Sequence, residues 1–545
     1  MTRPQAGLSA RYGGSAHPSP RAATGWSVQR IFGPSAVVGS NGLSQSPDGE
    51  VYIAQAYGSE ISALRLPDSG SAPQLRVVIA NDDPIVSPDD VAFGAQGEVF
   101  ATEIAVGRVG VRYADGNFGT VDDDVPAANG IATRGSRLFV GEFRAKGRIF
   151  ELFPSGAPRR TVVEQIDYPN GMSIDGAGQM YFPSVLAGEI WRVGIDGGPA
   201  EKVIEGLHFP TAVKCREDGS LWATQATGEI VRIDPRTRTF ATAAQLPIGN
   251  DNLLITADNR IIVSNYVSGL ICELQPDGTV DELLAPGLIG PLGLATDAGG
   301  NVFAADGWSY VVITPQGDLR RPAFRHTPGF PGLVRSVTLG HDGTPIFANT
   351  QGDIVRYQPG SAEPLASGLG YVVGMCVTPG GNVLVAEVGS GSLLEIGPQG
   401  VVTSVASGLR HPTGIAWSRH GVVVAESTAG RVLLVDGERR RILGEGLQQP
   451  HGVAVHDGWA YVLDRMGRSL HRYHLNEPHA ETIATDLPTG PGRQLVEQPV
   501  PGFDAVPGPW SPFAGLTADR EGRLYLSADG DGSVFRVEPA ETRQP

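Results

Sequence analysis

The chain has 545 residues, with 42 basic and 58 acidic side chains and a formal net charge of −16 at neutral pH. This length exceeds what one hydrophobic core usually supports, so we expect two domains or a long repeat array. The acidic balance and the lack of a stripe of Lys and Arg argue against nucleic acid as a partner. High glycine (74) and proline (42) contents with 18% charged residues favour short strands joined by tight turns.

Residues 1–25 are rich in Ala, Ser, Pro, Gly and Arg, and they lack the apolar stretch of a signal peptide. No run elsewhere approaches the length of a membrane span. We therefore expect a disordered leader over residues 1–25 in a soluble cytoplasmic protein that has no membrane partner. Residues Trp26 to Phe32 then form an isolated strand-like segment before the first repeat.

A unit of about 40 residues recurs along the rest of the chain. Its clearest copy begins at Pro169-Asn170-Gly171, passes through an Asp-Gly turn and an alternating strand, and ends near Val193. Each unit offers about four short strands, which is the spacing of β-propeller blades. In one register, the units start at Asn41, Asp89, Asn129, Asn170, Thr211, Asp251, Leu292, Arg335, Val373, Thr413, His451 and Ala514.

These repeats predict an all-β fold of two tandem six-bladed propellers, with twelve four-stranded blades, because twelve blades in one ring would leave a very wide hole. The last unit ends after its third strand, so its fourth strand must come from elsewhere to cover the sheet edge. We expect Trp26 to Phe32 to complete the sixth blade of the first propeller, and Thr279 to Leu284 to cross over to the last blade of the second. The predicted domains are then residues 26–277 and 278–545. In the alternative, the N-terminal strand closes the second propeller.

Two stretches exceed the repeat period. Val106 to Ala127 carries four aspartates, and Pro488 to Pro512 is rich in Pro and Gly. Long loops on one rim of a scaffold often serve as lids or specificity elements, and we expect that role for both stretches.

The first strand of a propeller blade lines the central channel, so the residue at its start lies near the axis. In the first half of the chain all six of these residues are polar. Converging carboxylate and amide oxygens suit calcium, with magnesium or manganese as other options, whereas zinc would need Cys or His. The simpler alternative is that each Asn or Asp forms a local turn. The predicted metal ligands are Asn41, Asp89, Asn129, Asn170 and Asp251, with the hydroxyl of Thr211 beside them.

The pattern Pro-Asn-Gly-hydrophobic, then Asp-Gly, then an aromatic or aliphatic strand resembles the NHL-repeat and SMP-30/gluconolactonase/LRE superfamily of six-bladed propellers. The resemblance covers nearly all of residues 26–538. That superfamily includes calcium-dependent lactonases and phosphotriesterases, whose axial calcium is held by Asn, Asp and Glu side chains at strand starts. An enzyme of that kind usually offers a Glu from its first blade, where this chain has Asn41. The positions that match best are Asp89, Asn129, Asn170 and Asp251.

The resemblance implies a calcium-dependent hydrolase of the lactonase or esterase type that acts on a small molecule at the axial opening of the first propeller. Calcium would act as a Lewis acid, and Asp89 or Asp251 would act as base or nucleophile. Strand two of each blade ends on the same face, which makes Glu103 and Glu142 further candidates for the general base. In the alternative, these two glutamates hydrogen-bond to backbone amides near the strand starts.

The second half of the chain lacks such a ring of oxygens, because Leu292, Val373 and Ala514 stand at half of the equivalent positions. His451 with Asp464 in the same blade forms a candidate acid/base pair. A second hypothesis is therefore a lyase or cyclase that acts on a metabolite through His451 and Glu426. A third is a non-catalytic propeller that serves as a scaffold for a protein partner.

Overall fold

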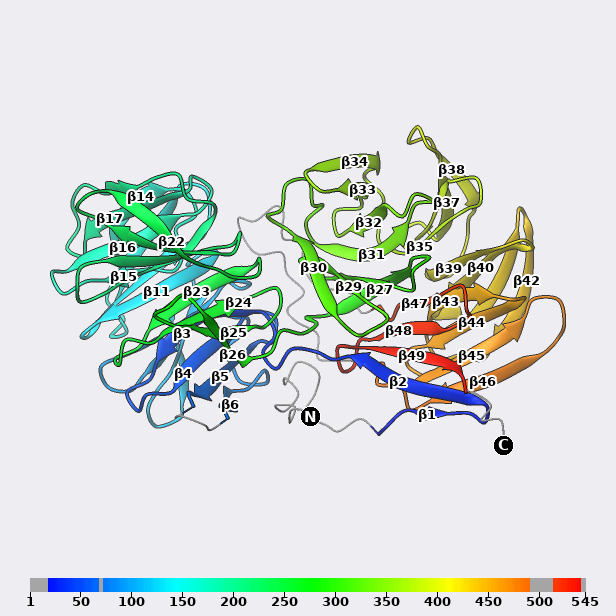
Figure 1. Ribbon diagram of the computed structural model, residues 1–545, viewed down its shortest axis with the longest axis horizontal. Helices are drawn as coiled ribbons and strands as arrows, with labels where there is room; N and C mark the ends of the chain where they lie inside the picture. The colour runs from blue at the N-terminus through cyan, green and yellow to red at the C-terminus, as the bar shows by residue number, and fades with distance from the viewer. Residues whose placement is uncertain (1–17, 68–71, 491–512, 541–545) are drawn as a thin grey trace. The chain divides into compact units, whose positions relative to one another are not determined.

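The computed structural model describes residues 18–67, 72–490 and 513–540. Regular structure in these ranges is β-strand, apart from one short 3-10 helix, η2 (Ser427–Ala429). The described strands form twelve antiparallel sheets, eleven with four strands and one with five. Figure 1 shows the sheets as the blades of two propellers. The prediction of an all-β fold with two six-bladed propellers is confirmed.

The first propeller consists of six blades, each made from four strands that follow one another in the sequence. In blade order the strands are β3 (Ser40–Gln45), β4 (Val51–Gln55), β5 (Glu60–Arg65) and β6 (Gln74–Ile79); β7 (Pro88–Phe93), β8 (Val99–Glu103), β9 (Arg108–Arg112) and β10 (Phe118–Asp122); β11 (Ala128–Arg134), β12 (Arg137–Glu142), β13 (Gly147–Leu152) and β14 (Arg160–Ile166); β15 (Ser173–Ile174), β16 (Gln179–Ser184), β17 (Glu189–Gly194) and β18 (Glu201–Ile204); β19 (Pro210–Cys215), β20 (Leu221–Gln225), β21 (Glu229–Asp234) and β22 (Thr239–Gln245); β23 (Asn250–Ile255), β24 (Ile261–Asn265), β25 (Ile271–Leu274) and β26 (Val280–Leu284).

The second propeller has four such blades, a fifth to which a strand from the N-terminal region is added, and a sixth that takes its fourth strand from that region. Its strands are β27 (Pro291–Thr296), β28 (Val302–Asp306), β29 (Ser309–Ile313) and β30 (Leu319–Phe324); β31 (Val334–Leu339), β32 (Pro345–Asn349), β33 (Ile354–Gln358) and β34 (Ser361–Ala366); β35 (Val372–Val377), β36 (Val383–Glu387), β37 (Ser392–Ile396) and β38 (Val402–Ala406); β39 (Pro412–Ser418), β40 (Gly421–Glu426), β41 (Arg431–Asp436) and β42 (Arg439–Glu445); β43 (Pro450–His456), β44 (Trp459–Asp464), β45 (Ser469–His474), β46 (Ala480–Thr485) and β1 (Arg21–Ala22); β47 (Leu516–Ala518), β48 (Leu524–Ala528), β49 (Ser533–Pro539) and β2 (Trp26–Phe32).

The fourth blade shows how the sequence repeat produces this structure. Between β15 and β16, Asp175 Oδ1 accepts hydrogen bonds from the amides of Ala177 (2.9 Å) and Gln179 (2.8 Å). Gly178 completes the turn at a φ of 82°, which favours glycine. Along β16, every residue from Met180 to Ser184 is buried, and Phe182 is fully buried. The Asp-Gly pair of the repeat is therefore a hairpin turn that sets the register of the two inner strands.

The hydrophobic core lies between blades, because each sheet buries both faces against its neighbours. One cluster, for example, joins Phe139 and Ile149 of the third blade to Met180 and Phe182 of the fourth. The first propeller closes in the same way, with β23 packed on β3. At that junction the Ser40 hydroxyl donates to the carbonyl oxygen of Asn265 (3.0 Å). The first ring is thus complete without a strand from outside residues 35–287.

The expected exchange of closing strands is wrong. β26 stays in the first propeller and pairs with β25, whereas β2 pairs antiparallel with β49 of the second. Trp26 and Val28 pack on the cluster that contains Phe535, and Arg30 forms a 2.7 Å ion pair with Asp531. The physical reason is that β26 already fills the outer edge of its own blade, so the free edge of β49 was the one left to cover.

This pairing also moves the domain boundary from residue 277 to residue 287. One compact unit contains residues 35–287, and the other contains residues 18–34 together with the described residues from 288 onward. From residue 18 onward, the chain thus contributes first to the second propeller, then forms the first, and returns to pair beside β2. At the return, the Leu288 amide donates to the carbonyl oxygen of Gly33 (3.2 Å). Of the predicted leader, Arg21 and Ala22 form β1 on β46, and residues 1–17 lie outside the described residues.

The stretch Val106 to Ala127 is not a rim loop. It contains β9 and β10, the two outer strands of the second blade, and its aspartates lie on or beside those strands. The repeat is not extended here, since only residues 123–127 separate β10 from β11. Of the other stretch expected to form a loop, Pro488 to Pro512, residues 491–512 lie outside the described residues.

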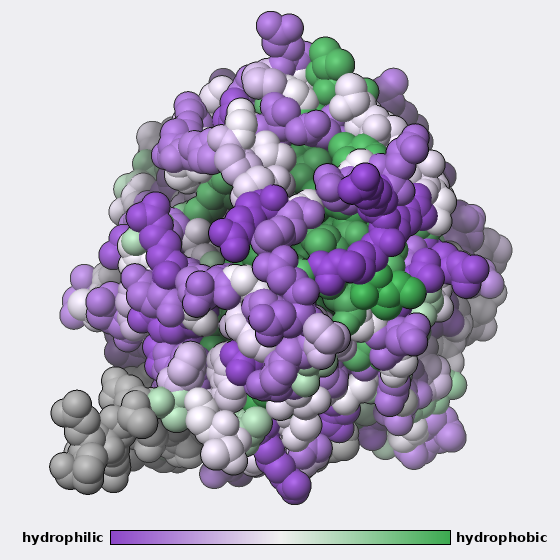
Figure 2. All heavy atoms as spheres, turned by 90° about the vertical axis from the view of Figure 1, so that its right-hand side faces the viewer, coloured by the Kyte–Doolittle hydropathy of each residue, from purple (hydrophilic) through white to green (hydrophobic). Residues whose placement is uncertain are grey.

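The surface is mainly polar. Figure 2 shows one face, on which hydrophobic side chains emerge in recesses between hydrophilic ones. Exposed apolar residues of the second propeller include Trp417 and Ile442, on strands β39 and β42. Within the described ranges, no helix has the length and apolar character needed to cross a membrane.

Candidate functional site at the axis of the first propeller

Five of the six predicted ring residues lie at the start of an innermost strand, Asn170 lies just before β15, and all six are at most 9% exposed. In five of the six blades the pairing of this strand shifts register at that point, for example between Pro88 and Asp90. Such bulges re-aim side chains. The Asn41 amide donates to Asp89 Oδ1 (3.3 Å) from the neighbouring blade, and Asp89 lies close enough to Asp251 for their charges to interact. Asn41, Asp89 and Asp251 therefore meet at the axis.

The glycines that follow three of the ring residues serve close packing, not turns. None of Gly42, Gly130 and Gly171 has a positive φ. A Cβ atom on Gly130 would lie 2.5 Å from the carbonyl oxygen of Asn170, and one on Gly42 would lie 2.0 Å from Asp90 Oδ1. The Asn-Gly pairs of the repeat thus allow neighbouring blades to approach each other at the hub.

Two ring oxygens have no partner. Asn41 Oδ1 and Asn129 Oδ1 are buried and accept no hydrogen bond within the part of the chain that the structure describes. A buried amide oxygen without a partner costs free energy, so its persistence calls for an explanation such as an ion. By contrast, Asn170 Oδ1 accepts from the Gly171 amide (2.7 Å), and the Thr211 hydroxyl is 2.6 Å from that of Thr224. The alternative that the ring residue only forms a local turn therefore applies to Asn170 but not to Asn41 or Asn129.

The two ring carboxylates repel each other. Burial, with the nearby charges of Asp251 and Asp90, raises the pKa of Asp89 well above its ordinary value. Burial and the charge of Asp90 raise the pKa of Asp251 to about 8, although Lys214 opposes the rise. A group of negative charge in a buried place, with unpaired amide oxygens beside it, is a suitable environment for a divalent cation.

A deeper layer of the channel was not predicted from the sequence. Asp90 Oδ2 accepts from the Ile131 amide (3.1 Å), and its Oδ1 lies 3.5 Å from the amide nitrogen of Asn252. Burial raises the pKa of Asp90 to about 6, and the nearby Lys214 lowers it. Lys214 itself donates to the carbonyl oxygen of Met172 (3.3 Å). The available signal was the doubled aspartate at positions 89 and 90, with a lysine near the end of the innermost strand three blades later.

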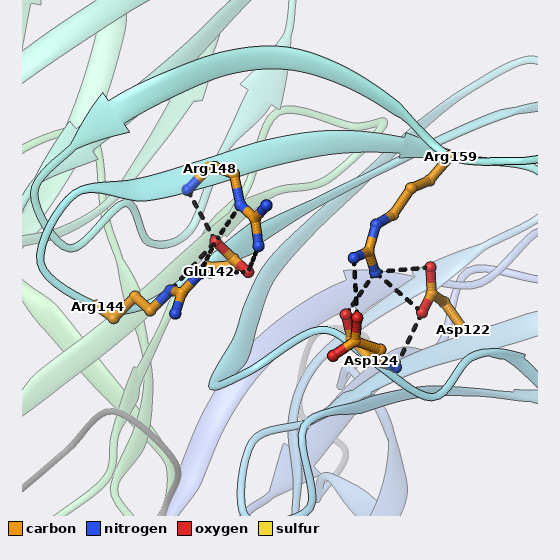
Figure 3. A network of polar contacts seen from close by, with 6 residues as sticks. All are labelled: Asp122, Asp124, Glu142, Arg144, Arg148 and Arg159. Carbon is orange, nitrogen blue, oxygen red and sulfur yellow. Dashed lines mark hydrogen bonds and ion pairs between the residues drawn. The ribbon is translucent and has the colours of Figure 1, made fainter.

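Glu103 and Glu142 are held in ion pairs instead of facing the ring as bases. Glu103 accepts from Arg108 Nε (2.8 Å) and from the Val86 amide (2.7 Å). Glu142 lies between Arg144 and Arg148, with nitrogen-to-oxygen distances of 3.0 and 2.8 Å (Figure 3). Neither glutamate is therefore the free general base that the sequence predicted, because the oxygens of both already accept hydrogen bonds from charged donors.

The same position serves as a structural clip in most blades. In each case a carboxylate or amide at the end of strand two accepts a backbone amide from the loop that leads into strand one. Nitrogen-to-oxygen distances are 2.6–2.9 Å for Gln55, Glu103, Glu387, Glu426 and Asp464. Glu426 is further paired with Arg431. This clip is the alternative that the sequence left open, and it holds for Glu103 but not for Glu142, which accepts the amide of Arg148 (3.2 Å).

Replacing Glu142 by Gln should therefore destabilise the first propeller by roughly 2–4 kcal/mol, because two arginines lose their counter-ion. The arginines lower the pKa of Glu142 below its ordinary value of 4.5, so its contribution is present above that pH and is lost as the pH falls further. Urea unfolding of both proteins at pH 7 and pH 3.5 should show a difference at pH 7 that shrinks at pH 3.5. An equal difference at both pH values would contradict this role.

His451 lies in a different setting, a pocket of about 420 Å³ at the axis of the second propeller. Its ring stacks on Phe513, and its Nδ1 accepts from the Ala514 amide (3.4 Å). Burial and the charge of Arg465 lower the pKa of His451 to about 3. Asp464 does not pair with it, because its oxygens accept the amides of Gln448 (2.9 Å) and Gln449 (2.7 Å). The predicted acid/base pair is thus not formed.

Across the described residues, no group of three or more His, Cys, Asp or Glu is arranged to hold a metal. A cation on the axis of the first propeller would therefore need amide oxygens beside the two carboxylates. Asn41 and Asn129 have such oxygens free.

Comparison with known protein families and with curated proteins finds no match. Among solved structures, the chain is similar to a streptogramin B lyase (16% identity, 60% of this chain and 96% of that one, TM-score 0.36) and to virginiamycin B lyase from Staphylococcus aureus (16%, 59% and 96%, 0.23). It is also similar to a chain of a nidogen/laminin complex (23%, 38% and 80%, 0.33). At these low identities and TM-scores, none of the three bears on the function of this chain.

Proposed function

We propose that the first propeller is a calcium-dependent hydrolase of the lactonase or esterase type, which acts on a small molecule at its axial opening. The observation that carries the proposal is the pair of unpartnered buried oxygens on Asn41 and Asn129 beside the mutually repelling carboxylates of Asp89 and Asp251. One divalent cation would satisfy all four groups. Calcium suits them best because it accepts several oxygens in flexible geometry, whereas magnesium demands a near-ideal octahedron and manganese is the third option.

Asp89 and Asp251 have different roles in the proposed reaction. Asp89 is oriented by the Asn41 amide, so it is the carboxylate best placed to hold the cation. The Asp251 carboxylate accepts no hydrogen bond from the residues that the structure describes, so one of its oxygens can hold the cation while the other takes a proton from an attacking water. A bound calcium would polarise the carbonyl oxygen of the ester or lactone. The resemblance of the repeat to lactonase propellers supports this reaction class.

Calcium should raise the melting temperature of the protein after treatment with EDTA, and metal analysis of the purified protein should find calcium. At free calcium about a hundredfold above its Kd, the expected stabilisation is about 2–3 kcal/mol. Asn129→Ala should weaken calcium binding about tenfold or more, while Asn117→Ala, an exposed amide of the second blade, should leave it unchanged.

The hydrolase part is tested separately, with a panel of lactones and aryl esters assayed with calcium and with EDTA. Turnover that needs calcium and is lost in Asp251→Asn would support it. Calcium binding without turnover would refute the reaction and retain the cation site. A protein whose melting temperature responds to neither EDTA nor calcium would refute both.

The lyase or cyclase hypothesis for the second propeller receives less support from the geometry. Glu426 is bound by Arg431 and by the Arg410 amide, and a histidine with a pKa near 3 is a weak base. A scaffold for a protein partner remains the non-catalytic alternative. It would be favoured by failure of both calcium tests.

A further inference from the structure

The second propeller contains a buried arginine that no carboxylate of the described residues neutralises. Arg335 starts the second blade of that ring and is 9% exposed. Its Nε has no hydrogen-bond partner, and the described residues offer its guanidinium no ion pair. The guanidinium instead lies over the ring of Tyr371, with 4.4 Å between Cζ and the ring centroid. Burial lowers the pKa of Arg335, although a guanidinium stays charged at neutral pH.

Two other arginines with buried side chains in this propeller have the carboxylate partner that Arg335 lacks among the described residues. Arg321 pairs with Asp306 at 2.9 Å, and Arg465 pairs with Asp529 at 2.5 Å. Each of these two charges is therefore compensated within the fold. Burial of an uncompensated charge is costly, and such groups are kept where a ligand supplies the opposite charge.

Arg335 lies behind one wall of the axial pocket of about 420 Å³, because its guanidinium stacks on the ring of Tyr371. Its partner Tyr371 lines that pocket together with Val373, His451 and Phe513. Phe513 packs against Leu292 and Val373, which occupy the ring positions on either side of Arg335. The volume and the mainly apolar and aromatic walls are typical of a site for a small organic molecule.

We propose that this pocket binds a small organic monocarboxylate with an apolar or aromatic body, whose carboxylate pairs with the guanidinium of Arg335. An arginine fork matches a carboxylate through two parallel hydrogen bonds, and the aromatic walls provide stacking surfaces for the body. A doubly charged phosphate fits less well, because the neutral His451 supplies no second positive charge. This site is separate from the ring of oxygens in the first propeller and does not depend on the hydrolase proposal.

The test is isothermal titration of the full chain with phenylacetate and with phenylacetamide, which has the same shape but no charge. Phenylacetate should bind, and the amide should bind at least about tenfold more weakly. In Arg335→Met the affinity for phenylacetate should also fall at least about tenfold, and Arg335→Lys should keep part of it. Arg439→Met, which removes an exposed arginine of the same propeller, should change nothing.

A second measurement separates ligand binding from a structural role. Without ligand, Arg335→Met should melt at a higher temperature than the natural protein, because an uncompensated buried charge is replaced by an apolar chain. A structural arginine would give the opposite shift. The proposal is overturned if phenylacetate does not bind, if the amide binds equally well, or if Arg335→Met retains the affinity. The comparison of acid and amide decides even if that variant does not fold.

Discussion

Replacing Asp251 by Asn is expected to make the metal-free protein more stable at neutral pH and to remove its response to calcium. In the folded state burial and Asp90 raise the pKa of Asp251 from 3.8 to about 8. Between these two values the folded chain binds a proton that the unfolded chain has released. The stability contributed by this group is therefore complete below pH 3.8 and is lost as the pH rises toward 8.

Because Asn does not ionise, the variant should lack this loss. The difference in unfolding free energy between variant and natural protein should grow from near zero at pH 4 to roughly 2–4 kcal/mol at pH 8. Calcium should abolish the difference by stabilising only the natural protein. Hydrogen exchange of β23 to β26, measured in EDTA and in calcium at both pH values, reports on the first propeller alone.

The matched control is Asp258→Asn, which removes an exposed carboxylate from the turn between β23 and β24. It should leave both the pH dependence and the calcium response unchanged. If Asp251→Asn also retained its calcium response, Asp251 would not be a ligand of the cation. If its stability changed with pH as in the natural protein, the repulsion at the axis would not be the cause.

Deleting residues 1–33 is expected to unfold the last blade of the second propeller and to leave the first propeller intact. The deletion removes β2, with Trp26 and Val28 from the core and Arg30 from its ion pair with Asp531. Partial burial of these two side chains contributes a few kcal/mol and the pairing of β2 with β49 adds to it, so a loss of more than about 3 kcal/mol is expected. The exposed edge of β49 should also promote aggregation.

Hydrogen exchange resolves this outcome by region. Exchange should accelerate in β47 to β49 and remain slow in β23 to β26. A chain that lacks only residues 1–17 is the control and should behave as the natural protein, since β1 and β2 remain. Loss of protection in β23 to β26 would instead support the strand exchange that the sequence suggested, and would contradict the observed pairing.

The blades could be predicted because their signals are local. An Asp-Gly turn such as that at Asp175 and the alternation along Gln179 to Ser184 are contained within a few residues. The closing strand could not be assigned in this way. The sequence of Trp26 to Phe32 predicts a strand that could pair with any open sheet edge. Which edge it pairs with depends on β26, which completes the last blade of the first propeller.

The site shows the same division. The sequence placed Asn41, Asn129, Asp89 and Asp251 at strand starts, but it could not show which oxygens would be free. Asn170 has the same Asn-Gly context as Asn129, yet its oxygen is taken by the Gly171 amide. Glu103 and Glu142 were candidates for a base because of their position, and only the neighbouring arginines reveal their role.

The sequence by itself determined the all-β class, the number of blades and the residues that start each innermost strand. These features follow from turn chemistry and alternation, which act between residues close in the chain. The tertiary structure decided which propeller β2 closes, which ring oxygens lack a partner among the described residues, and that Arg335 finds no counter-ion there. These features depend on contacts between residues far apart in sequence, and the cost of burying an unpaired polar or charged group is set by those contacts alone.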